Sequence, residues 1–176
     1  MNEMNVLVAP RELKDQIEKA SRVIGCEASV ADRLAEDVTF CEINYGQGIP
    51  SWFEIANLDA ATLNEALGSS FQLRLPPDTE STDVYFDSPI LFVLLARTLH
   101  NQESCGVTWS CDTEVISGNS KITSIHLRSN TLFSKSTNRK MADALSNGLT
   151  VPTREWEQLS EIASQFLMPE EILDAS

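Results

Sequence analysis

The chain has 176 residues, a formal net charge of −13 and an apolar content of 42%. This length and composition predict one domain, residues 1–176, that buries a core of its own. The negative charge opposes encounters with nucleic acid and with anionic membranes, so we expect neither as a partner.

The four cysteines, Cys26, Cys41, Cys105 and Cys111, have no CxxC spacing. Zinc sites need soft ligands at short, repeated intervals, so we expect no metal site. No signal peptide is recognisable, which favours a cytoplasmic location and reduced thiols. A pair of Cys105 or Cys111 with His126 across a sheet stays open, because sequence cannot show spatial adjacency.

The first part of the chain has apolar residues at helical spacing. The pattern predicts helices over 10–25, 29–46 and 49–57. Pro10 lies in the first turn of the first helix and Gly25 follows its last turn. Ser29 is the expected N-cap of the second helix.

The stretch "GQGIPSWFE", residues 46–54, connects the second and third of these helices. Gly46 stands where a helix end needs a left-handed residue, and Gly48 permits a sharp turn. Pro50 can start a helix without losing a hydrogen bond. A corner between two helices therefore explains the stretch, and a turn that grips a ligand is the alternative.

The run "VADRLAEDVTFCEINYGQGI" resembles the start of the malate/lactate dehydrogenase-like family. In that family the opening helices lead to a turn with a histidine between its glycines. This sequence has Gln47 there, so the acid/base group of the turn is missing. The resemblance implies, as an alternative function, a small-molecule enzyme or ligand-binding protein related to these oxidoreductases.

The same opening helices, the middle apolar run and the ending "LTVPTREWEQLSEIASQFLMPEE" together resemble an uncharacterised bacterial family, the domain of unknown function 3726. Its late strand leads into a helix with a tryptophan and then a proline-containing exit. Matching positions here are Val151, Trp156, Leu159, Ala163 and Pro169. The family's glycine-rich tail is missing. The resemblance implies a fold with a helix near 153–167 and carries over no catalytic residue.

The middle of the chain predicts both strand and helix. Phe71, Leu73 and Leu75 alternate as in a short strand. "SPILFVLLARTLHN" predicts a central buried helix over 88–101, with Ser88 as its N-cap and Pro89 as its first residue.

The segments "CGVTWSC", "TEVIS" and "KITSIHLRS" have period-two patterning, which predicts an antiparallel hairpin or meander with a turn at Gly118-Asn119. The fold class expected is therefore α+β: a helical subregion, about 10–68, packs on a small, mostly antiparallel sheet in a mixed subregion, about 69–176, and a C-terminal helix closes the fold.

Residues 115–142 contain no acidic side chain but five basic ones. Three hypotheses remain open for this basic window. Its side chains pair with the acidic helices of the first half; or Lys135, Arg139 and Lys140 line a site for a small anion at a helix start; or the window docks an acidic surface of another subunit.

No glycine-rich phosphate loop and no short hydrolase or metalloprotease motif occurs in the sequence, so no cofactor is expected. The function we favour is a binding or assembly protein, as a homo-oligomer or an accessory subunit of a partner protein, without a catalytic site of its own.

Overall fold

The computed structural model describes residues 4–130 and 137–167. It confirms the α+β class. The helices are α1 Pro10–Val23, α2 Ala28–Tyr45, α3 Gly48–Ala56, α4 Ala60–Ser69, α5 Ala96–Ser104, α6 Arg139–Asn147 and α7 Thr153–Ser164; the strands are β1 Asn5–Val8, β2 Ser81–Leu91, β3 Val107–Cys111, β4 Lys121–Ser129 and β5 Leu149–Pro152. Short 3-10 turns lie at Ser70–Gln72, Phe92–Leu94 and Gln165–Leu167.

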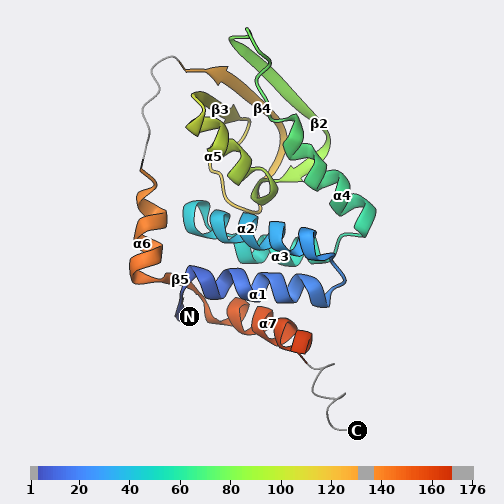
Figure 1. The fold of residues 1–176 in the computed structure, drawn as a ribbon, viewed down its shortest axis with the longest axis vertical. Helices are drawn as coiled ribbons and strands as arrows, with labels where there is room; N and C mark the ends of the chain where they lie inside the picture. Colours follow the sequence, from blue (N-terminus) through green and yellow to red (C-terminus); the bar gives the residue numbers. More distant parts are fainter. Residues whose placement is uncertain (1–3, 131–136, 168–176) are drawn as a thin grey trace.

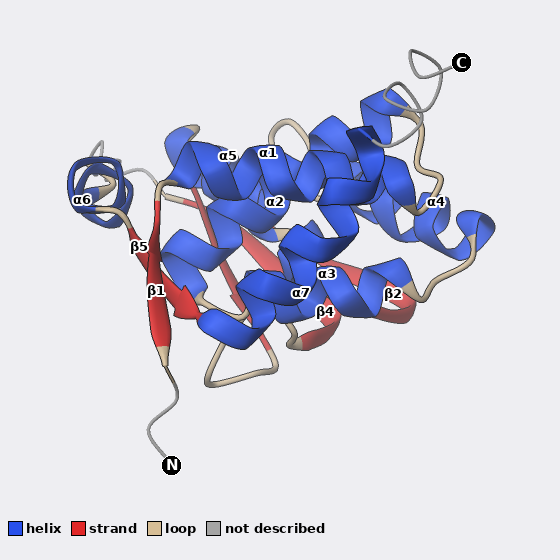
Figure 2. Ribbon diagram, turned by 90° about the horizontal axis from the view of Figure 1, so that it is seen from below, coloured by secondary structure: helices blue, strands red, loops and turns tan. Residues whose placement is uncertain are grey.

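The strands form two antiparallel sheets. The larger has the order β2-β4-β3, and the smaller pairs β1 with β5. α7 packs against α1 and α1 against α2, so these three helices stack in layers below the larger sheet (Figures 1 and 2). Within the described residues no helix combines the length and the apolar character that crossing a membrane requires.

The expected N-terminal helices are confirmed. Pro10 is the first residue of α1, and Gly25, with φ 99°, follows its C-cap. The N-cap prediction for α2 is wrong, because α2 begins at Ala28 and its N-cap is Glu27. Trp52 is fully buried in α3 and its indole N–H donates to Ser21 Oγ at 2.9 Å, which anchors α3 to α1.

The expected helix over 88–101 is wrong in its first half. Ser88 and Pro89 belong to β2, and α5 begins only at Ala96. The run is buried throughout from Phe92 to Ala96, and periodicity cannot distinguish a buried strand from a buried helix in such a run. Pairing of Ile90 with Ile122 in β4 decides for the strand.

The expected strand at 71–75 is a 3-10 turn, Ser70–Gln72, that extends α4. Helix α4 has a clear local cause, since the Asp59 carboxylate caps it by accepting from the backbone N–H of Thr62 at 2.8 Å. Leu73 is buried, whereas Phe71 is 67% exposed and its ring lies beside the Arg33 guanidinium.

The antiparallel pairing of β3 with β4 confirms the expected hairpin, with a longer connection. The segment "TEVIS" is not a strand, and its Val115 is 83% exposed. The turn comes just before β4, where the backbone N–H of Ser120 donates to Ser117 O at 3.0 Å.

Candidate functional site

The glycine-rich corner at residues 46–50 is filled by protein. A Cβ on Gly48 would lie 2.6 Å from the carbonyl oxygen of Val38, and one on Gly118 would lie 2.6 Å from that of Gln47. The Glu42 carboxylate accepts from the backbone N–H of Ile49 at 2.8 Å and so caps the start of α3. Close packing explains Gly48 and Gly118, and the stretch forms the corner between α2 and α3 that the sequence predicted.

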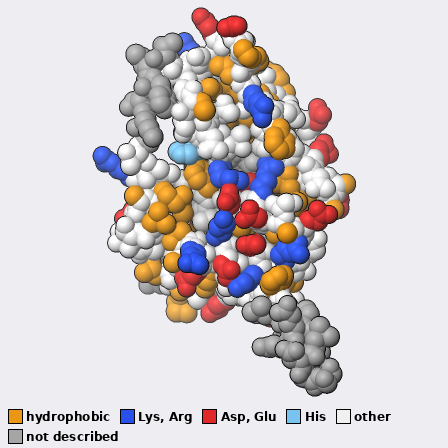
Figure 3. Space-filling model, in the orientation of Figure 1, with side chains coloured by type: hydrophobic (Ala, Val, Ile, Leu, Met, Phe, Trp, Pro, Cys, Tyr) orange, Lys and Arg blue, Asp and Glu red, His pale blue; other side chains and the backbone are white. Residues whose placement is uncertain are grey.

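A charged cluster joins α1, α2 and α5 on one face of the molecule (Figure 3). Arg97 donates to Asp37 and to Glu36, both at 2.6 Å; Lys14 donates to Glu36 at 3.0 Å, and Arg33 to Asp37 at 3.3 Å. Asp37 is only 3% exposed, and burial raises its pKa while the two arginines oppose that rise. These acidic partners of the first half are thus occupied by basic groups outside the basic window.

The window itself is divided by the fold. Lys121 lies 3.9 Å from Glu54 of α3, which is one pairing with the acidic first half. Arg139 and Lys140 begin α6, and the Lys140 ammonium donates to the carbonyl oxygen of Asn44 at 2.8 Å. Lys135 lies outside the described residues. The structure therefore brings together two of the three residues of the proposed anion site.

Arg139 and Lys140 border an open cleft of about 630 Å³ together with Tyr45 and His100. The start of α6 is already capped, because the Asn138 side chain accepts from the backbone N–H of Met141 at 3.0 Å. One of the donors that an anion would use at a helix start is therefore taken. The anion site stays a prediction.

The histidine and cysteine positions exclude one of the nucleophile pairs left open by the sequence. His126 lies opposite Asp83 and Ser110 on neighbouring strands, and its Nδ1 is 2.7 Å from Asp83 Oδ1. Cys111 lies opposite Ile125 and so faces the other side of the sheet. Within residues 4–130 and 137–167, no three side chains of His, Cys, Asp or Glu lie close enough together to hold a metal ion.

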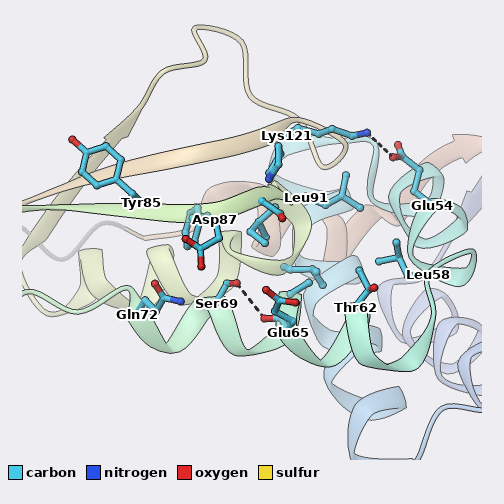
Figure 4. A pocket seen from close by; sticks show the side chains of 16 residues that line it. Glu54, Leu58, Thr62, Glu65, Ser69, Gln72, Tyr85, Asp87, Leu91 and Lys121 are labelled. Carbon is cyan, nitrogen blue, oxygen red and sulfur yellow. Dashed lines mark hydrogen bonds and ion pairs between the residues drawn. The ribbon is translucent and has the colours of Figure 1, made fainter.

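The groove that best fits a binding site lies between α4 and β2 (Figure 4). It arises from an irregularity in β2: Tyr85 pairs with Ser124 and Ile90 with Ile122, so residues 86–89 stand against Thr123 alone. The extra residues leave the ladder and widen the space beside α4 to a cavity of about 350 Å³. That volume is in the range of ligand pockets.

The wall of the groove is apolar and its rim is acidic. Leu58 and Ala66 line it from the helical side, and Pro89, Ile90, Leu91 and Leu94 line it from the β2 side. Among the described residues that line the groove, Glu54, Glu65 and Asp87 oppose a single cation, Lys121. In Figure 4 the Asp87 carboxylate points from β2 toward α4, where Glu65 lies, while Lys121 reaches toward Glu54.

The charges of the rim are unequally matched. Lys121 and Glu54 are 66% and 44% exposed in their side chains, so their ion pair is weak. Among the described residues no ion pair forms at Glu65 or Asp87. An apolar wall below two unpaired carboxylates suits a ligand that carries a positive charge on an apolar body.

The residues of this groove were not found by sequence reasoning. Because a helix was expected over 88–101, the irregularity in β2 was not predicted. Nothing in the sequence distinguished Glu65 from the other acidic residues. The Asp59 cap was the one local signal that could have placed α4, but nothing local places α4 beside β2.

Comparison of the chain with protein-family models, with curated proteins and with solved structures finds no match. Both resemblances described above therefore stay predictions.

Proposed function

We propose that this chain is a binding protein that holds a positively charged, partly apolar ligand in the groove between α4 and β2. The observation that supports the proposal most is the combination of an apolar wall with three carboxylates against one lysine. The proposal makes the binding role that the sequence analysis favoured more specific. It predicts a cationic ligand at a site that no sequence motif indicated.

The expected affinity follows from the geometry. A ligand that buries about 100 Å² of apolar surface gains about 2.5 kcal/mol. Ion pairs with Glu65 and Asp87, which are both exposed side chains, add roughly 0.5 kcal/mol each. A small ligand is therefore expected to bind with a Kd of about 3 mM or weaker, and the binding should weaken with salt.

The test compares two probes of nearly equal shape and opposite charge, 4-phenylbutylamine and 4-phenylbutanoate. We expect the amine to shift the backbone amide NMR signals of α4 and of residues 85–91 in a saturable way, and the carboxylate to leave them in place. The variant Glu65→Lys should weaken the binding of the amine about fivefold, because it removes one ion pair and adds a repulsion of similar size.

The matched control is Glu157→Lys, the same charge reversal at an exposed position of α7, away from the groove (Figure 1). It should bind the amine as the parent does. Equal binding of both probes, or signals that shift only outside the groove, would contradict the proposed function.

A further inference from the structure

We propose that the ligand of this groove is an extended peptide segment of a partner protein, which adds as a strand to the free edge of β2. This inference rests on the proposed function and names the partner class of the same site. Three observations carry it: an unpaired strand edge, the length of the groove, and the placement of its charges.

The first observation is the edge itself. β2 pairs only with β4 in the described part of the chain, so its other edge has no strand partner. Figure 4 shows α4 along that edge, on the side away from β4, with the groove between them. Edge strands expose unpaired N–H and C=O groups that bind another extended chain unless the edge is blocked. Pro89 removes only one of these donors.

The second observation is length. The groove is lined by β2 from Tyr85 to Leu91. Tyr85 pairs with Ser124 and Leu91 with Lys121, so this stretch advances by only three residues of β4. At about 3.3 Å per residue this spans roughly 10 Å, which matches an extended segment of about three or four residues. Alternate side chains of such a segment would face the apolar wall at Leu58 and Leu94. A small amine would fill a part of this space and leave the strand edge unpaired.

The third observation is charge. A Lys or Arg side chain of the bound segment would reach Glu65 from α4 and Asp87 from β2. A second copy of this chain is disfavoured as the source of the segment, because each copy carries a net charge of −13 and approaches an acidic rim. The occupant is thus a basic segment of a different protein.

The experiment selects peptides from a random octapeptide phage library on the immobilised full chain and measures the selected peptides by titration. We expect them to alternate apolar residues with Lys or Arg. Methylation of alternate backbone nitrogens along one edge of the peptide should weaken binding at least tenfold, and methylation along the other edge should change it little. Glu65→Lys should abolish binding and Glu157→Lys should not.

Each possible result supports or contradicts one of the two proposals. If the amine binds but no selected peptide depends on Glu65, the groove is a small-molecule site: this inference falls and the proposed function stands. Peptides that tolerate N-methylation along both edges would overturn strand addition. A homodimer that Glu65→Lys dissociates would place a second copy in the groove and overturn the assignment to a different protein. If neither the amine nor a peptide binds, both proposals fall.

Discussion

Replacing Gly48 by alanine tests whether the glycine-rich corner is packed for structure. Gly48 does not have a positive φ, so alanine fits its backbone. The added methyl group, however, would lie 2.6 Å from Val38 O and 2.9 Å from both the backbone nitrogen and Cβ of Glu42. Two of these neighbours are backbone atoms and cannot rotate away. Overpacking of this kind costs about 1–3 kcal/mol.

The matched control is Gly68→Ala in α4, where an added Cβ would meet no atom within 4 Å. It should stabilise the protein by about 0.5–1 kcal/mol through helix propensity. The two substitutions make the same chemical change, so the free energies of unfolding of the two variants should differ by about 1.5–4 kcal/mol.

Urea denaturation followed by tryptophan fluorescence, to which the buried Trp52 contributes, measures both free energies of unfolding. The urea midpoint should fall for Gly48→Ala and rise for Gly68→Ala, while the slope of the unfolding free energy against urea concentration stays unchanged. If Gly48→Ala proves as stable as Gly68→Ala, the close packing argued for the corner is wrong.

Three further predictions follow from the charged groups. Arg97→Met leaves the buried Asp37 with only Arg33 and should lower the free energy of unfolding by about 2–3 kcal/mol, less than for a fully enclosed pair because the Arg97 side chain is 34% exposed. Adding Asp37→Asn should recover part of this loss. If the effects of the two substitutions simply add in the double variant, the coupling between Arg97 and Asp37 is contradicted. Burial raises the pKa of Glu42 above its ordinary value of 4.5, so the parent protein loses stability as the pH rises from 4.5 through the pKa of the folded state. Glu42→Gln removes this loss, so the stability of the variant relative to the parent, measured in denaturation curves, should improve as the pH rises above 4.5. A difference that does not change with pH would refute the pKa shift. Inorganic phosphate should bind at millimolar concentration near Arg139 and Lys140, and this binding should weaken as salt is added. Replacing both residues by alanine should abolish phosphate binding without unfolding the protein. An NMR titration that shows no shift at these residues would exclude the anion site.

The local signals in the sequence were sufficient for the N-terminal helices. Pro10, Gly25 and Gly46 mark ends of α1 and α2 through backbone preferences that act within one turn, and the apolar stripes set which faces are buried. The same signals placed the start of α6, where Arg139 and Lys140 were expected to enter a helix. The stretch at 46–54 was correctly interpreted as a corner between two helices, but the reason given for Gly48 was wrong, because Gly48 has no positive φ and is required by close packing against α2.

Only the tertiary structure decided the candidate groove and the burial of charge. Whether "SPIL" becomes helix or strand depends on pairing of Ile90 with Ile122, more than thirty positions away, which a local pattern cannot contain. Asp37 is a charged residue of α2, yet it is buried, and its contacts with Arg97 of α5 and with Arg33 make that burial tolerable. Helix ends are encoded within a few neighbouring residues, whereas a binding groove is a relation between elements distant in the chain.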